Sequence, residues 1–193
     1  MNLVKIIITL LVSLFIGYQV ATHVDFNTNH EFGDVIDKID NVKVYYNGGV
    51  NHTEGRSVTS DNYNLGLKYQ CAEFVKRYYY KRYKHKMPNS YGHAKDFFNP
   101  KLTHGEMNKD RGLRQFFNHD KTKPRKGDLV VFDSYLLNSY GHVAIVSKVD
   151  DEFIEIIQQN PGPFSSSRES FKLHKTDDVW HIEADHLLGW LRR

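Results

Sequence analysis

The fold is decided by residues 70–83, which read QCAEFVKRYYYKRY. Counted from Cys71, apolar side chains recur at i+3, i+4, i+7 and i+8, which is the spacing of one face of an α-helix. Residues 87–89, MPN, break the pattern. Basic residues between positions 76 and 86 occupy much of the remaining surface, and we expect them to face solvent. The pattern therefore predicts an amphipathic helix over residues 70–83.

Cys71, the only cysteine of the chain, stands at the predicted start of this helix. Unpaired backbone N–H groups at a helix N-terminus carry partial positive charge, so they favour the thiolate that attacks an amide carbonyl. The same N–H groups and the side-chain amide of Gln70 are candidate donors to the oxyanion that this attack creates. The alternative is that Cys71 packs in the core as a small apolar residue. A single cysteine excludes an intrachain disulfide and a cysteine-based zinc site.

The second half of the chain contains apolar and β-branched runs that predict strands. Residues 142–149 and 153–158 flank a short polar turn and are expected to form a hairpin. The other predicted elements are a strand over 129–132, a last strand over 187–191, and short helices over 93–98 and 112–118. Helices that precede an antiparallel sheet indicate an α+β fold, with the N-terminal helices packed on the sheet.

His142 follows Gly141 at the start of its predicted strand. An imidazole near Cys71 can take the thiol proton and later protonate the leaving amine. Such a base needs a partner that orients its ring. The hairpin brings residues 158–160 back level with His142, and strand alternation puts Gln158 and Asn160 on one side, so either carbonyl is a candidate partner. The alternative is that this polar run only ends the hairpin.

Other chemistries lack their motifs. The chain contains no G-x-S-x-G elbow, no G-x-x-x-x-G-K-[ST] loop, no H-E-x-x-H pair and no dinucleotide fingerprint. We therefore expect no metal and no cofactor. The net charge of +3, from 26 basic and 23 acidic residues, is too balanced to predict a nucleic-acid partner.

Three ordered motifs resemble one known family. Residues 69–75 (YQCAEFV), 127–132 (GDLVVF) and 141–146 (GHVAIV) are similar to those of the CHAP domain, the cysteine, histidine-dependent amidohydrolase/peptidase domain of papain-like proteins. Within that family the chain looks most like the amidase domain of bifunctional glutathionylspermidine synthetase/amidase. The resemblance covers roughly residues 45–190.

This resemblance implies a papain-like fold with Cys71 as nucleophile, His142 as general base and Gln70 as oxyanion donor. It places Gln158 where close relatives carry a glutamate that orients the histidine, with Asn160 in a supporting role. The implied mechanism is independent of metal. The resemblance also puts a lysine, Lys76, where those relatives have an arginine implicated in substrate binding.

The N-terminus predicts a targeting segment. Residues 6–21 are almost entirely apolar and follow a single lysine at position 5. This run is intermediate between the apolar core of a signal peptide, about 7–15 residues, and a spanning helix of about 20 residues. We expect residues 1–21 to be either a signal peptide, cleaved after Ala21, or a membrane anchor. Residues 22–44 are expected to form a spacer and residues 45–193 the catalytic domain.

Export places the domain in the periplasm or cell envelope, or outside the cell. The expected function is hydrolysis of an amide bond in peptidoglycan peptides, by a monomer that touches the membrane only through residues 1–21. One alternative is a glutathionylspermidine-type amidase that acts on a small amide. Another is a binding module of the same fold with little catalytic activity.

Overall fold

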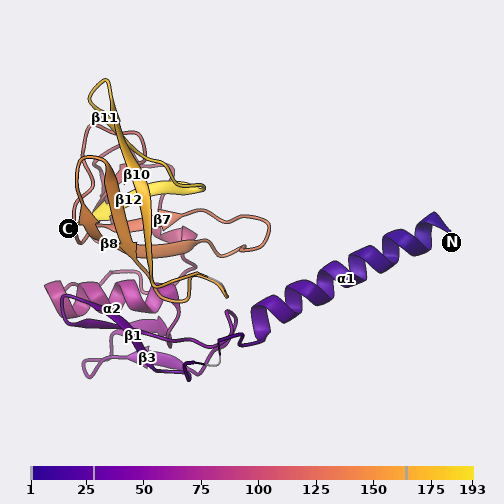
Figure 1. Ribbon diagram of the computed structural model, residues 1–193. Helices are drawn as coiled ribbons and strands as arrows, with labels where there is room; N and C mark the ends of the chain where they lie inside the picture. Colours follow the sequence, from indigo (N-terminus) through magenta and orange to yellow (C-terminus); the bar gives the residue numbers. More distant parts are fainter. Residues whose placement is uncertain (1, 28, 164) are drawn as a thin grey trace.

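An eight-stranded antiparallel sheet forms the body of the computed structural model (Figure 1), which describes residues 2–27, 29–163 and 165–193. Its strands lie in the order β11-β10-β9-β8-β7-β12-β6-β5, and each neighbouring pair is antiparallel. The strands are β5 Met107–Asn108, β6 Leu113–Phe117, β7 Leu129–Phe132, β8 His142–Val149, β9 Phe153–Ile157, β10 Arg168–Thr176, β11 Val179–Ile182 and β12 Leu187–Arg192.

Helix α2, Cys71–Tyr83, packs against β8 on one side of this sheet. Two small sheets also contact the helix, one through β2 and the other through β4. Their strands are β1 Val35–Ile39 and β2 Val42–Tyr45 in one sheet, and β3 Arg56–Val58 and β4 Asn64–Leu67 in the other. A helix packed on an antiparallel sheet confirms the predicted α+β fold class.

Both faces of the central strands are buried. Along β8, Val143 and Ile145 join the core beneath α2. Ala144 and Val146 point the other way and join a second core around Trp190. Because both sides are covered, the strand appears in the sequence as a continuous apolar run instead of an alternating one. This is why the strands at 129–132 and 142–149 were predictable.

The predicted spacer is wrong for residues 35–44, which form the β1–β2 hairpin. Val42 and Val44 of this hairpin are fully buried in the core beneath α2. Residues 40–41, in its turn, both have positive φ, as a tight hairpin turn requires. The folded domain therefore begins well before residue 45.

Two predicted short helices also differ from the structure. The predicted helix over 112–118 is wrong, because Leu113–Phe117 form β6, which pairs with β12 on one side and β5 on the other. Residues 93–98 contain only the 3-10 turn η1, Lys95–Phe97. Strands β10 and β11 lie in a polar stretch of sequence and were not predicted.

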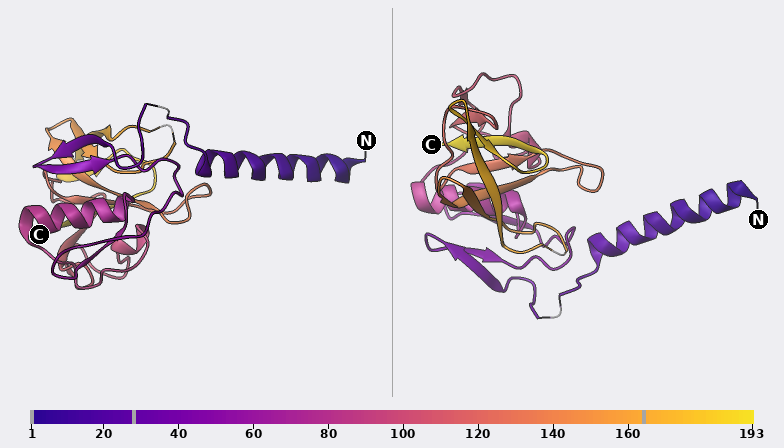
Figure 2. Two further views of the ribbon diagram at one scale, coloured as in Figure 1. Left: turned by 90° about the horizontal axis from the view of Figure 1, so that it is seen from below. Right: turned by 45° about the horizontal axis from the view of Figure 1, so that its top comes forward.

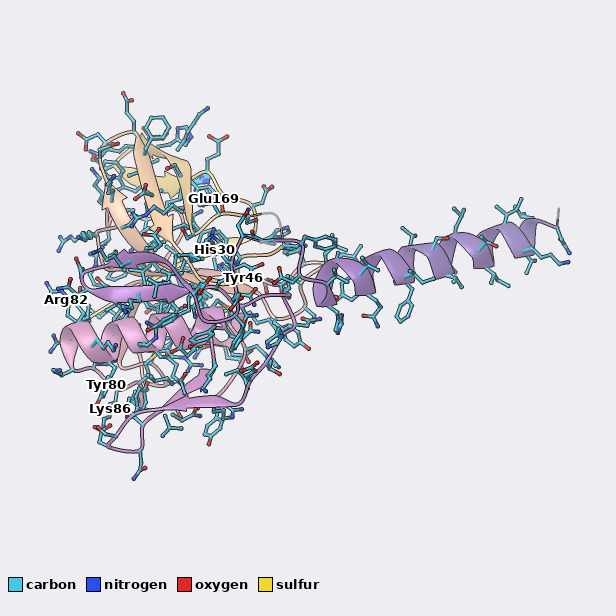
Figure 3. All side chains as sticks on the ribbon, turned by 60° about the horizontal axis from the view of Figure 1, so that its bottom comes forward. His30, Tyr46, Tyr80, Arg82, Lys86 and Glu169 are labelled. Atoms are coloured by element: carbon cyan, nitrogen blue, oxygen red, sulfur yellow. The ribbon has the colours of Figure 1, made fainter. Side chains whose placement is uncertain are left out.

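Helix α1, Leu3–His23, leaves the domain as a single arm (Figures 1 and 2). By length and composition it can cross a membrane, with a mean hydropathy of 2.1 over its apolar window. None of its residues is buried, and its side chains stand clear of the domain (Figure 3). The N–H of Asn51 donates to the carbonyl of Thr22 at 2.9 Å, so the end of α1 is joined to the domain.

Candidate active site

Cys71 is the first residue of α2 and lies against the start of β8. Its sulfur is within hydrogen-bonding reach of the backbone N–H of Val143, the residue after His142. The N–H groups of Cys71 and Ala72 also face the sulfur. Such first-turn groups have no acceptor within the helix. The structure thus brings the thiol to the backbone one residue after the predicted base, His142.

His142 is the first residue of β8, and its ring is held by Gln158. The imidazole Nε2 and the amide Oε1 of Gln158 are 3.0 Å apart, so Nε2 carries the proton and donates to the carbonyl. Nδ1 is then the unprotonated nitrogen, and it makes no hydrogen bond to the residues that the structure describes. This is the tautomer in which an imidazole can accept a proton through Nδ1.

Gly141 fixes the start of the strand that carries His142. Its φ is +72°, and a Cβ added there would lie 2.5 Å from the carbonyl oxygen of Phe132. Phe132 is the residue of β7 that pairs with His142. A side chain at position 141 would therefore push apart the two strands at the point where the histidine is positioned.

Burial keeps both reacting groups neutral. It lowers the pKa of His142 to about 4, although the hydrogen bond to Gln158 opposes this shift. It also raises the pKa of the Cys71 thiol above its ordinary value, although the nearby N–H groups lower it in part. The expectation of a resting thiolate is therefore wrong, because loss of water outweighs the helix N-terminus. Both shifts favour the neutral forms, a thiol and an unprotonated imidazole.

Gln70 does not present a free amide to the thiol. Its Nε2 donates to the carbonyls of Val50 at 3.2 Å and of His52 at 3.0 Å. Its Oε1 accepts a hydrogen bond from Nδ2 of Asn160 at 2.7 Å. Both amide hydrogens are thus engaged, which contradicts the prediction of Gln70 as an oxyanion donor. The first-turn N–H groups of α2 are the donors that remain.

Asn160 lies away from the imidazole of His142, contrary to the prediction. Strand β9 ends at Ile157, and Asn160 itself has a φ of +52°, so strand alternation no longer sets its direction. Its Nδ2 donates to the carbonyl of Val50 at 2.8 Å as well as to Gln70. Asn160 therefore holds the 48–52 loop beside the start of α2.

Gln159 was not predicted as a site residue, and its side chain anchors the first turn of α2. Its Oε1 accepts from the N–H of Tyr45 at 2.8 Å and from Arg77 at 3.1 Å. Its Nε2 donates to the carbonyl of Gln70 at 3.2 Å and to Glu73 at 3.1 Å. Glu73 and Arg77 form a buried ion pair with an N–O distance of 2.6 Å. The i, i+4 spacing of this pair was the available signal in the sequence.

Lys76 is 2% exposed and is not placed to bind a substrate. Its Nζ donates to the carbonyls of Asn64 at 2.6 Å and of Ser90 at 2.7 Å. Burial lowers the pKa of this ammonium to about 8. The predictions of a substrate-binding and of a solvent-facing Lys76 are both wrong, because β4 and the 84–94 segment cover this side of α2.

Glu169 of β10 is a second residue that the sequence did not indicate (Figure 3). Its Oε2 accepts from Nε2 of Gln158 at 3.3 Å, and the carbonyl of Ser166 accepts from the same nitrogen at 3.1 Å. These contacts fix which end of the Gln158 amide faces His142. A carboxylate thus lies one amide group away from the imidazole.

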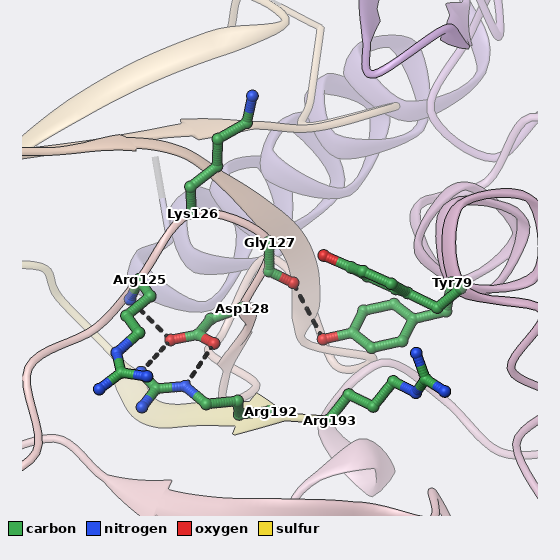
Figure 4. A pocket seen from close by; sticks show the side chains of 8 residues that line it. Tyr79, Arg125, Lys126, Gly127, Asp128, Arg192 and Arg193 are labelled. Atoms are coloured by element: carbon green, nitrogen blue, oxygen red, sulfur yellow. Dashed lines mark hydrogen bonds and ion pairs between the residues drawn. The ribbon is translucent and has the colours of Figure 1, made fainter.

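A hollow of about 410 Å³ lies at the opposite end of α2 (Figure 4). Tyr79 and Tyr83 of α2 line it, together with residues 125–128 and 192–193. Neither Cys71 nor His142 is among its lining residues.

A cysteine at a helix N-terminus, beside a strand histidine held by an amide carbonyl, is the arrangement of papain-like proteins. The CHAP domain family model matches residues 61–160, more than half of the 193-residue chain, and the chain belongs to this family of amidases and peptidases. The resemblance predicted from the three sequence motifs is thereby confirmed.

Two curated relatives come from Crithidia fasciculata. Trypanothione synthetase is 26% identical over 161 residues, which are 78% of this chain and 24% of that protein. Glutathionylspermidine synthase is 29% identical over 139 residues, which are 66% of this chain and 19% of that protein. The chain thus spans about a quarter and a fifth of the lengths of these relatives.

Two crystal structures are similar in part. Ly7917 is 15% identical with a TM-score of 0.39, and the match covers 65% of this chain and 53% of that one. The wild-type endolysin LysIME-EF1 is 20% identical with a TM-score of 0.36, and the match covers 71% of this chain and 61% of that one.

Proposed function

We propose that the protein is a metal-independent cysteine hydrolase that cleaves amide bonds with Cys71 and His142. One observation carries this proposal. His142 is held through Nε2 by Gln158 at 3.0 Å, while the sulfur of Cys71 lies against the N–H of the next residue, Val143. Nδ1 is therefore the basic nitrogen that is left to take the thiol proton, since it has no hydrogen bond to the described residues.

The reaction follows from the neutral resting pair. As the sulfur of Cys71 attacks the carbonyl carbon, its proton passes to Nδ1 of His142. The oxyanion forms next to the first-turn N–H groups of α2. The imidazolium then protonates the leaving nitrogen, the C–N bond breaks and a thioester remains. Water, deprotonated by the same imidazole, cleaves the thioester and restores the thiol.

The proposed substrate is a peptide of the cell wall, and the proposed location is outside the cytosol. Helix α1 supports this location, since an N-terminal apolar segment of 21 residues suits either a signal peptide or a membrane anchor. Peptidoglycan is the abundant source of short amide-linked peptides in that compartment. Glutathionylspermidine is the second candidate, because two curated relatives are synthetases of glutathionylspermidine or trypanothione. That candidate requires a domain in contact with the cytosol.

The test is direct. The full chain, in detergent micelles, is incubated with purified peptidoglycan and separately with glutathionylspermidine, and the products are identified by mass spectrometry. Release of muropeptides that requires Cys71 and persists in a chelator is the expected result. Cleavage of glutathionylspermidine alone would overturn the proposed substrate and keep the chemistry. Binding to peptidoglycan without any product would favour a non-catalytic module.

A further inference from the structure

The β7–β8 loop, residues 133–141, ends in a tight turn with two leucines at its tip. The N–H of Tyr135 donates to the carbonyl of Asn138 at 2.9 Å, and the N–H of Asn138 donates back at 3.0 Å. Leu136 and Leu137 are the two residues between them, and their exposed fractions are 97% and 63%. Turn positions favour glycine, asparagine, aspartate, proline and serine, so two leucines here call for a reason other than turn formation.

The base of the loop is braced and not loose. The Asn138 side chain donates to the carbonyl of Gly141 at 3.0 Å and accepts from the N–H of Tyr140 at 3.0 Å. Tyr135 stacks on His186 with ring centroids 5.3 Å apart, and Tyr140 packs against His93 at 4.8 Å. These contacts fix the conformation of the loop, so that Leu136 and Leu137 are exposed at its tip and Tyr135 and Tyr140 lie nearer its base.

The charge pattern of the loop suits the interface of a lipid bilayer. Asp133, at the base, is the one acidic or basic residue of the loop sequence, and residues 134–141 read SYLLNSYG. Lys95 stands at the base, with its Nζ 3.5 Å from the hydroxyl of Ser134. Leucines at a tip, tyrosines behind them and a lysine at the base match the order of apolar core, interface and headgroup in a bilayer.

The loop also projects toward the side from which α1 leaves the domain, in all three ribbon views (Figures 1 and 2). The end of α1 is bonded to the 48–52 loop through Thr22 and Asn51, and that loop accepts hydrogen bonds from Gln70, the neighbour of Cys71. The tip of the β7–β8 loop and the end of α1 thus flank the same end of the domain, which is the end that carries Cys71 and His142.

We propose that α1 is retained as a membrane anchor and that Leu136 and Leu137 insert into the surface of the same bilayer, as a second point of attachment. The domain is then held with the end that carries Cys71 and His142 toward the lipid surface. The partner is the bilayer, because the apolar tip points to the same side of the domain as α1, an apolar helix long enough to span a membrane. This attachment goes beyond the proposed hydrolysis and does not depend on it.

The test places a fluorescent probe on the loop of the full chain in proteoliposomes. Leu137→Cys, in a Cys71→Ala background that removes the other thiol, is labelled with the environment-sensitive dye NBD. Phe153→Cys in the same background is the matched control, since Phe153 is exposed and begins β9 beyond the far end of β8, about 26 Å away along an eight-residue strand. Phosphatidylcholine that carries a shallow doxyl group is the quencher.

The expected result is an emission at shorter wavelength for the probe at 137 than at 153, with quenching by the doxyl lipid at 137 alone. Leu136→Cys should behave like Leu137→Cys. Equal spectra and no quenching at 137 would overturn the proposal, as would a chain that fails to float with the vesicles. A shift at 137 that grows with the protein-to-lipid ratio, without quenching, would assign the tip to a second copy of the chain and would also overturn it.

Discussion

The two ends of α2 place polar groups around a helix terminus in opposite ways. At the N-terminal end, the sulfur of Cys71 lies against the N–H of Val143, the residue after His142, and Nδ1 of the imidazole has no partner among the described residues. At the C-terminal end, the buried carboxylate beside the hollow is paired. Asp128 accepts two hydrogen bonds from Arg192, at 2.8 and 2.6 Å, and Tyr79 donates to the carbonyl of Gly127 at 3.0 Å (Figure 4).

This difference separates a site for chemistry from a site that stabilises the fold. The hollow has a volume of about 410 Å³, yet its buried carboxylate is already neutralised by an arginine. The N-terminal end offers a nucleophile, first-turn N–H groups that face it, and a base whose Nδ1 has no hydrogen bond to the described residues. Free hydrogen-bonding capacity, and not the size of a depression, therefore locates the candidate active site in this protein.

The largest effect is expected from Cys71→Ala. Because the thiol forms the covalent intermediate, its removal should lower turnover by about 10⁴-fold or more, measured as product released by the full chain. Tyr83→Phe, at the hollow, is the control at the other end of α2 and should keep the parent rate. Turnover that persists in the Cys71→Ala protein would mean that the nucleophile lies elsewhere.

Gln158→Leu should lower kcat by about 10²-fold, because the imidazole loses the acceptor that holds its tautomer. Gln158→Glu keeps an acceptor for the imidazole, so we expect a smaller loss of kcat than in Gln158→Leu. Some loss remains, because the new carboxylate faces Glu169 and the Ser166 carbonyl, which in the parent accept hydrogen bonds from the amide. Adding Glu169→Gln should recover activity in the Gln158→Glu protein. If Gln158→Leu matches the parent, another group orients His142.

The pH dependence should reflect the half-buried imidazole of His142. Burial lowers the pKa of His142 to about 4, so the acid limb of kcat/KM should lie near pH 4 and not near the ordinary histidine value of about 6.5. Protonated His142 cannot accept the thiol proton, and activity is therefore lost as the pH falls through that limb. The same residue destabilises the fold as the pH falls from about 6.5 toward 4, because only the unfolded chain then binds the proton. An acid limb between pH 6 and 7 would contradict the proposed environment of His142.

At the C-terminal end, Asp128→Asn should reduce stability and leave the chemistry intact. The substitution removes the charge that pairs with Arg192, and breaking a buried ion pair costs about 3 kcal/mol of the free energy of unfolding. Denaturant titration of the domain measures this change, and kcat at a temperature where the variant is folded should equal that of the parent. A large fall in kcat in the folded variant would make the hollow part of the active site.

A smaller loss of stability is expected for Lys76→Met. The buried carbonyls of Asn64 and Ser90 lose their donor, which costs about 1–3 kcal/mol, while KM should stay the same. Lys81→Met, at an exposed position on the same helix, is the control and should change neither quantity. A rise in KM for Lys76→Met alone would restore the substrate-binding role that the resemblance implied.

The sequence predicted the parts of the molecule that carry a local signal. Helix α2 and strands β7, β8, β9 and β12 show clear apolar runs or helical spacing, and each was found with its bounds nearly correct. Cys71 and His142 were recognisable because the first begins the helix and the second begins a strand. The hairpin geometry also led to Gln158, which contacts the imidazole.

The remaining features depend on contacts between distant segments. Desolvation in the folded protein raises the pKa of the Cys71 thiol, and the spacing of apolar residues along a helix does not predict this desolvation. The side chains of Gln70 and Asn160 turn toward the 48–52 loop, and no spacing within their own segments predicts that loop's position. Lys76 is buried because β4 covers a helix face that looks polar in the sequence.

Gln159 has a consequence for how substitutions in this chain will be interpreted. Its amide uses both ends at once, accepting from a backbone N–H and an arginine and donating to a backbone carbonyl and a glutamate. Glutamate in its place has no donor, lysine has no acceptor, and asparagine is one methylene too short. A saturation scan scored by activity would therefore find position 159 as intolerant as position 71. The two positions would separate only when the abundance of each variant is measured alongside its turnover, because one fails by losing the fold and the other by losing the nucleophile.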